Sequence, residues 1–510
     1  MGCSISTKQS EYKKQVTNPD ISIFPYKILL GPIIGLVTHN SARILVEFGA
    51  DVEGGDVFLG YETYETEIIG TLTSITDQID KTSTIKMKCN VAIVFKFTDL
   101  SPKTKYTFKI QKIKNQIDSS FTTLSDHLNE NTFNVAFCVC NDIIAKKKLG
   151  DNNLFNNINE RVKDGEINFL IHFGEQVFMD HKFRDKEGIN VYQQCMDIIS
   201  NKNKTLWEFS QNQIINKMKQ LYRRTWSGAV AQVMANCPNL MMYDDHDIHN
   251  NFGYGKNLLD DNDPNNFVEK CARRVYYEYQ RQLREDVDYI NFNGVTEEYF
   301  QHILNQIGFF FLDHRGSKTW YKDPKDPSYY GNPQMENFKH CMTNVFANCP
   351  IIIIISQIPL VLFNEESTKT EKKAKEQFLK NDKENYEKFL TNFSEIKKKS
   401  NQKIILIGGD IYIGGFTDII KNGEIIMHQV TTSGVVYETT KKEPILVEKI
   451  TNQSDYLLPS GYSFKHHNWV HNRNYATLEM KMQNLTPKVI GYLTISDFNI
   501  RPYQHEIVHI

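Results

Sequence analysis

The sequence has no apolar run near the ~18 to 20 residues that a membrane-spanning helix needs. The strongest run, residues 351–355 followed by 358–363, is interrupted by Ser356, Gln357 and Pro359. This pattern favours a buried strand and its exit loop. The N-terminus also lacks an apolar segment of the signal-peptide type.

Cysteine is sparse, and several common motifs are missing. The 510 residues contain nine cysteines, an odd number without repeated spacing, which argues against a disulfide framework and indicates a reducing compartment. Walker A, G-x-G-x-x-G and G-x-S-x-G sequences are absent, which disfavours P-loop, dinucleotide-binding and α/β-hydrolase chemistry. The net charge is only −2, so composition predicts no nucleic-acid partner.

The N-terminus begins Met-Gly-Cys-Ser-Ile-Ser, which matches the M-G-x-x-x-[ST] pattern of N-myristoylation. Gly2 is the expected acceptor, and Cys3 stands where a palmitate would add the second anchor that stable membrane binding requires. We expect residues 1–24 to be a flexible lipid-anchor segment on the cytoplasmic side of a plasma or ciliary membrane. The alternative is a disordered terminus that starts this way by chance.

Residues 25–128 show an all-β pattern. Short segments at 42–48, 57–61, 91–97 and 106–110 are rich in β-branched and aromatic residues and are bounded by turn residues. Residues 100–106 resemble the corner of a fibronectin-like sandwich, which Tyr106 closes. We therefore predict a small β-sandwich.

From residue 129 to 510 apolar runs alternate with amphipathic helices, as in an α/β layered domain. Helices are expected over about 191–223 and 265–284, a charged helical insertion over 368–400, and a β-rich C-terminal tail over 457–510. His466, His467 and His471 are interpreted as exposed loop histidines.

Four loops, each following an apolar run, carry the residues suited to metal chemistry. They cover residues 137–142, 172–180, 243–251 and 407–415. The third contains the string Asp-Asp-His-Asp-Ile-His-Asn, whose acidic groups repel one another unless cations or water neutralise them. Carboxylate, amide and imidazole ligands suit divalent ions and iron, and two adjacent metals can clamp a phosphoryl group. A single such string also fits a solvated loop.

These loops resemble the PhoD-like family of alkaline phosphatases and phosphodiesterases, within the metallophosphatase superfamily. That family carries H-x-G-D-Q-x-Y-x-D, D-D-H-D/E-x-x-x-N and S-G-D-x-H, and residues 172–180, 244–251 and 408–412 follow these patterns. The likeness extends through residues 222–226, 312–315, 356–359 and 415–418. It implies an α/β fold of metallophosphatase-like layered sheets flanked by helices, with an N-terminal fibronectin-like β-sandwich.

The resemblance also implies roles for particular residues. Iron with calcium, or other divalent ions, would bind a phosphoester substrate. Cys140, Glu175, Asp245, Asn250 and Asp410 are the implied metal ligands, with Glu175 as the bridging acid. His246, Asp245 and Tyr412 are the candidate catalytic residues. Groups that support the ligands or contact phosphate are Asp142, Asp180, Asp244, Asp247 and His249.

Three residues depart from the family pattern. Glu175 replaces an aspartate, Phe178 replaces a metal-binding tyrosine, and Tyr412 replaces the final histidine. A tyrosine binds ferric iron as phenolate, so Tyr412 would offer a substitute for both lost groups. Two functions stay open: a membrane-tethered, metal-dependent phosphomonoesterase or phosphodiesterase, and an inactive pseudophosphatase without metals that acts as a scaffold, with a protein assembly as its partner.

Overall fold

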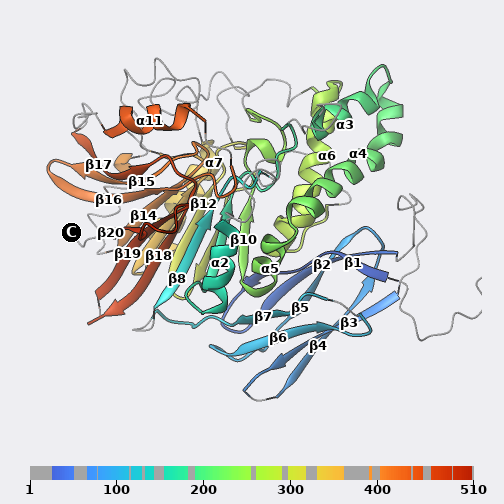
Figure 1. Cartoon of the computed structure of the whole chain (residues 1–510), viewed down its shortest axis with the longest axis horizontal. Coiled ribbons are helices and arrows are strands. Elements are labelled where there is room, and N and C mark those ends of the chain that lie inside the picture. Colours follow the sequence, from blue (N-terminus) through green and yellow to red (C-terminus); the bar gives the residue numbers. More distant parts are fainter. Residues whose placement is uncertain are drawn as a thin grey trace, which may run out of the picture.

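The computed structural model describes residues 26–50, 66–76, 78–113, 116–128, 132–142, 154–181, 190–253, 260–289, 297–317, 330–360, 390–392, 395, 402–437, 440–451, 461–484 and 486–507. Within these ranges the strands form four sheets, two small ones near the N-terminus and two larger central ones (Figure 1). Gly2, Cys3, the expected strand at 57–61 and most of the insertion at 368–400 lie outside the described residues.

The two small sheets pack together as the predicted sandwich. One contains β1 (Tyr26–Val37), β2 (Ala42–Ala50) and β5 (Ala92–Phe97), and the other contains β4 (Asp80–Met87), β3 (Thr66–Ser74), β6 (Lys105–Ile110) and β7 (Ser119–Thr122). Ile44, Phe95 and Phe108 are among the buried side chains that join them. The Tyr106 hydroxyl accepts a hydrogen bond of 2.9 Å from the Ser101 N–H, which confirms the predicted tyrosine corner.

The two central sheets have six and seven strands. The first has the order β10 (Asn239–Met242), β9 (Phe169–Phe173), β8 (Phe133–Cys138), β18 (Asn474–Gln483), β19 (Thr486–Ile495) and β20 (Tyr503–Ile507). The second has the order β11 (Phe300–Leu304), β12 (Ile307–Leu312), β13 (Ile351–Ser356), β14 (Lys403–Gly408), β16 (Glu424–Thr431), β15 (Gly414–Lys421) and β17 (Tyr462–Val470). The expected C-terminal tail therefore supplies four strands that are integral to these sheets.

Both faces of the parallel strand β13 are covered, which explains its unbroken run of isoleucines. Ile351, Ile353 and Ile355 lie in the core between the two central sheets. Ile352 and Ile354 face the other way, into a second core. A strand that is buried on both sides reads as a continuous apolar segment, so the sequence predicts it without an alternating pattern.

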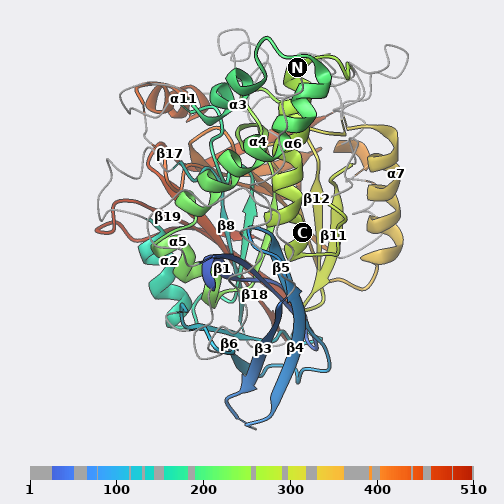
Figure 2. The same cartoon turned by 90° about the vertical axis from the view of Figure 1, so that its right-hand side faces the viewer.

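Helices cover the outer faces of this pair of sheets. They are α2 (Leu154–Lys163), α3 (Val191–Ile199), α4 (Lys204–Thr225), α5 (Ala229–Asn236), α6 (Pro264–Tyr279), α7 (Asn332–His340) and α11 (Lys442–Thr451), with short turns η2 (Asp245–Asp247), η4 (Arg281–Leu283) and η5 (Cys341–Val345). Figure 2 shows α2 and α5 on one side of the sheets and α7 on the other. Among the described residues, none of the helices combines the length and apolarity needed to cross a bilayer.

The sandwich is joined to the helical layer by a buried ionic contact. Glu47 on β2 is fully buried, and both of its carboxylate oxygens accept hydrogen bonds from Arg223 on α4, at 2.7 and 2.9 Å. The Tyr279 hydroxyl on α6 donates a third, at 2.8 Å. The buried charge of Glu47 is therefore compensated by groups on helices α4 and α6.

One sequence-based expectation about histidines is wrong. His466 and His467 lie on strand β17 and are half-buried, whereas His471, just beyond the strand, is exposed in a loop as expected. Strand β17 lies at the edge of its sheet, and part of its surface faces solvent. Polar residues therefore follow one another along it, and the sequence lacks the alternation of apolar and polar residues that identifies a strand.

Candidate metal centre

Four loops bring the predicted ligands to one edge of the central sheets. Cys140 follows β8, Glu175 follows β9, Asp245 follows β10 and Asp410 follows β14. Strands β8, β9 and β10 run parallel side by side, so their C-terminal ends meet at the same edge. The seven-stranded sheet supplies β14 from across the core. Residues far apart in the chain therefore converge on one place.

The backbone of this edge adopts angles that non-glycine residues seldom take. Cys140, Glu175, Asp410 and Tyr412 have φ values of 63°, 50°, 65° and 59°. Each such residue costs of order 1–3 kcal/mol, and this strain persists only where surrounding contacts hold it. Here the Asn141 N–H donates a hydrogen bond of 2.8 Å to the Glu175 carbonyl and links two of the loops. Strain of this kind gathers at functional sites.

Four buried carboxylates form an acidic cluster. One oxygen from each of Glu175, Asp244, Asp245 and Asp410 lies within 4.8 Å of the others. Glu175 Oε2 and Asp244 Oδ2 are buried and have no hydrogen-bond donor among the described residues. Carboxylates buried in such numbers need positive charge or protons for compensation, and their oxygens are the donors that a hard or borderline metal ion prefers.

Arg315 supplies part of the compensating charge. It is fully buried, and its Nε donates a hydrogen bond to Asp244 Oδ1. Its Nη2 lies 3.4 Å from Asp245 Oδ1 and 3.5 Å from Asp410 Oδ2. A single guanidinium cannot balance four ionised carboxylates, so the charge balance of the cluster also depends on protons or on a cation.

His246 lies beside the acidic cluster with its ring held from two sides. Its Nδ1 is 2.7 Å from Asp180 Oδ1, and its Nε2 is 3.7 Å from Glu175 Oε1. The ring stacks on Phe178, with centroids 4.7 Å apart. Burial alone lowers the pKa of His246, but Asp245, Asp180 and Glu175 outweigh it and raise that pKa well above its usual value. The surrounding carboxylates therefore favour the protonated imidazole.

The pKa values of two acids and of the thiol in this centre are raised, which favours their protonated forms. Burial, followed by the neighbouring carboxylates, raises the pKa of Glu175 and of Asp244 well above the usual range, against the opposing pull of His246 and Arg315. Burial and the nearby Glu175 likewise raise the pKa of the Cys140 thiol. A cation would replace these protons, because metal ligands must be deprotonated.

Tyr412 fills the space next to Glu175. Its hydroxyl donates a hydrogen bond of 3.1 Å to Glu175 Oε1, and its backbone N–H donates one of 2.9 Å to Ser433 Oγ. Its ring stacks on Tyr437 with centroids 3.7 Å apart. Burial raises the pKa of Tyr412, so its oxygen is a phenol unless a cation displaces the proton. The phenol thus lies one hydrogen bond from the acidic cluster.

Asp247 ties the loops together from behind the acidic cluster. Its buried Oδ1 accepts the Gln176 N–H at 3.0 Å and the Gln280 amide at 3.1 Å, while Oδ2 accepts the Asp244 N–H at 2.8 Å. The carboxylate thus fixes the backbone of two loops that carry predicted ligands.

The remaining predicted residues lie around the acidic cluster and have partners of their own. Asp142 Oδ2 lies 2.7 Å from His181 Nδ1, and His249 Nε2 lies 2.6 Å from Glu269 Oε1. Asn250 is exposed, and its backbone N–H donates to Asp180 Oδ2 at 2.7 Å. The structure gathers Cys140, Glu175, Asp244, Asp245, His246 and Asp410 at the centre, with Asp142, Asp180, Asp247, His249 and Asn250 farther out.

Comparison with protein-family models shows which family the chain belongs to. A model described as a PhoD-like phosphatase matches residues 135–489, more than two thirds of the chain and all four loops. The chain belongs to the PhoD-like phosphatase family. No curated protein matches the sequence.

Two solved structures share the PhoD-like fold. A structure of PhoD is 12% identical, with a TM-score of 0.65, and the alignment covers 97% of this chain and 94% of that one. A purple acid phosphatase isolated from yellow lupin (Lupinus luteus) seeds is 10% identical, with a TM-score of 0.55, over 92% of this chain and 72% of that one. At these identities the likeness establishes the fold.

Arg315 of this PhoD-like centre lies in the segment 312–315 that the sequence included in the family likeness, but it was given no role there. It follows strand β12, and the Asp313 carboxylate accepts its backbone N–H at 2.9 Å. Its position just beyond an apolar strand was the feature of the sequence that could have indicated a place in the centre. Its contact with Asp244, Asp245 and Asp410 depends on the packing of three separate segments, which no local pattern reveals.

Proposed function

We propose that this protein is a metal-dependent phosphoester hydrolase acting on phosphomonoesters or phosphodiesters. The observation that carries the proposal is the gathering of four buried carboxylates, from three loops, within the reach of one metal ion. Two of their oxygens, Glu175 Oε2 and Asp244 Oδ2, are buried without a donor among the described residues. Membership of a phosphatase family agrees with this chemistry.

The side chains of the centre would have different roles in this reaction. When bound, divalent cations at such a site neutralise the charge of a phosphoryl group and activate water for in-line attack. Arg315 holds Asp244, Asp245 and Asp410 in a fixed arrangement. Asp180 accepts a hydrogen bond from Nδ1–H of His246, which directs the Nε2–H toward the centre, where it would stabilise the leaving oxygen as a donor.

A second candidate function is that of a pseudophosphatase scaffold. Phe178 has no oxygen to offer a metal, and Tyr412 uses its hydroxyl to bond Glu175, the proposed bridging acid. Both aromatic side chains are buried, so they fill space that a larger ligand would need. In this alternative the fold persists as a platform, and the excess negative charge is relieved by protonation of Glu175 and Asp244.

One comparison distinguishes the two functions. We expect the purified parent protein to retain at least one equivalent of iron or of a divalent ion and to hydrolyse a chromogenic phosphodiester. The comparison protein is the triple variant Glu175→Asp, Phe178→Tyr, Tyr412→His. If the parent has neither metal nor turnover under any divalent supplement, and the triple variant acquires both, the parent is a pseudoenzyme and the hydrolase proposal fails.

We also propose that lipid on Gly2 and Cys3 tethers the protein to the cytoplasmic side of a membrane. The motif is the support for this proposal, together with Lys8, Lys13 and Lys14, which would attract anionic lipid at about 1 kcal/mol each. Labelling cells with an alkyne analogue of myristate is expected to mark the protein and not its Gly2→Ala variant. Equal membrane fractions for the two proteins would contradict the proposal.

A further inference from the structure

A second group of ligand-type side chains lies between the edges of the two central sheets. Asp418 on β15 lies directly opposite His428 on β16 in the strand register, and His467 comes from the neighbouring strand β17. His505 reaches the same place from β20, an edge strand of the other sheet. None of these residues belongs to the acidic cluster around Glu175 and Asp410.

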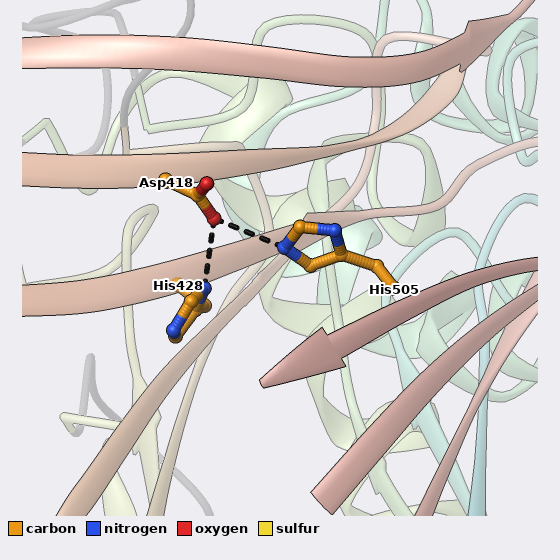
Figure 3. A group of neighbouring side chains, drawn as sticks. All are labelled: Asp418, His428 and His505. Atoms are coloured by element: carbon orange, nitrogen blue, oxygen red, sulfur yellow. Dashed lines mark hydrogen bonds and ion pairs between the residues drawn. The ribbon is translucent and has the colours of Figure 1, made fainter. Parts of the chain in front are cut away.

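All three imidazoles are directed at one carboxylate. His428 Nδ1 lies 2.9 Å and His505 Nε2 lies 3.0 Å from Asp418 Oδ1, as the dashed lines in Figure 3 show. His467 Nε2 lies 2.8 Å from the other oxygen, Oδ2. Ligand atoms of Asp418, His428 and His505 all lie within 4.8 Å of one another. This separation is close enough for a modest shift to place them around one ion.

The orientation of these side chains is supported by their surroundings. Asp418 and His428 are buried, while the side chains of His467 and His505 are 25% and 16% exposed, which leaves an approach from solvent. The Phe416 ring stacks on His505, with centroids 5.1 Å apart. Both oxygens of the Asp418 carboxylate thus have imidazole partners.

We propose that Asp418, His428, His467 and His505 form a metal site for Zn²⁺ or a similar borderline divalent cation. Three imidazole nitrogens and one carboxylate oxygen are the ligand types that zinc prefers, and four protein ligands complete its tetrahedral shell. A site filled in this way is structural. It would tie the five-residue strand β20 to the edge of the seven-stranded sheet and so lock the two central sheets together.

The ligand chemistry separates this histidine site from the acidic cluster. The acidic cluster offers four carboxylates with the single imidazole of His246 beside them, whereas the histidine site offers mainly nitrogen. In the absence of metal each imidazole is hydrogen-bonded to Asp418. A bound cation would take the place of these hydrogen bonds, so a ring N–H that faces Asp418 would move to the other ring nitrogen or leave. The plain alternative is a hydrogen-bonded cluster that holds β20 without any ion.

Zinc titration of the metal-stripped protein tests the proposal. We expect Zn²⁺ alone to raise the melting temperature, and Co²⁺ to bind with the visible absorption of a tetrahedral site. Asp410→Asn, which alters only the acidic cluster, should keep both responses. His505→Gln and His467→Gln, each at a partly exposed ligand, should weaken Zn²⁺ binding at least about tenfold. His471→Gln, at the exposed histidine beyond β17, is the matched control and should behave like the parent.

Two outcomes overturn the site. If His505→Gln and His467→Gln bind Zn²⁺ as tightly as the parent, the group is a hydrogen-bonded cluster only. If Asp410→Asn abolishes the zinc response, the ion resides in the acidic cluster. Melting curves in chelator confirm that the variants are folded before metal is added.

Discussion

An Asp410→Asn variant is expected to lose cation binding at the acidic cluster and to hydrolyse a chromogenic phosphodiester at least about 100-fold more slowly than the parent. Asparagine keeps the shape of the side chain but removes one of the four charges that a cation would neutralise. The same change relieves repulsion in the metal-free protein. We therefore expect the melting temperature in chelator to be equal to or above that of the parent, and the rise on adding iron or calcium ions to be smaller.

The combination of these two effects separates a metal site from a structural role. An aspartate that only stabilised the fold would lower the melting temperature in chelator when replaced. Asp261→Asn is the matched control, because this aspartate is exposed and pairs with Lys270 on the surface. Metal content, turnover and melting temperature should all match the parent in that variant. Full activity in Asp410→Asn would refute the role given to the acidic cluster.

A Glu47→Ala variant is expected to lose about 3–5 kcal/mol of unfolding free energy. The substitution leaves the Arg223 guanidinium and the Tyr279 hydroxyl without the buried carboxylate that both of them contact. Lys219 Nζ, 3.8 Å from the same carboxylate, also loses a nearby negative charge. Urea unfolding, followed by tryptophan fluorescence and by far-ultraviolet circular dichroism, measures the loss.

Asp286→Ala is the matched control for this contact. Asp286 also bridges the sandwich and the helical layer, through Arg43 and Lys96, but it is 66% exposed. Exposed pairs contribute roughly 0–1 kcal/mol, so this variant should unfold close to the parent. Equal losses in the two variants would mean that burial does not set the strength of the contact between the sandwich and the helices.

The local patterns of the sequence predicted most elements, for physical reasons that differ between them. The isoleucine run of β13 is continuous because both faces of the strand are covered. Helix α6 begins at Pro264, with Asp263 as its N-cap, as its apolar spacing and proline predict. The expected helix over 191–223 is divided into α3 and α4, because Asn203 caps a new helix where the first one has ended.

The histidine site shows where such reasoning ends. His466 and His467 were interpreted as loop residues, and Asp418, His428 and His505 carry no local signal that they meet. They come from strands of two sheets, and only the stacking of those sheets brings His505 to Asp418. The contact of Arg315 with three acids has the same origin.

By itself, the sequence determined the β-sandwich, the alternation of strands and helices, and which residue types end the strands, because these features depend on neighbours a few positions apart. Its motifs also placed the chain in its family. Only the tertiary structure decided that the acids of the second, third and fourth loops lie close together. It also decided that the Tyr412 hydroxyl donates a hydrogen bond to Glu175, and that three histidines surround Asp418. Those contacts arise from the packing of whole sheets, in which residues hundreds of positions apart become neighbours.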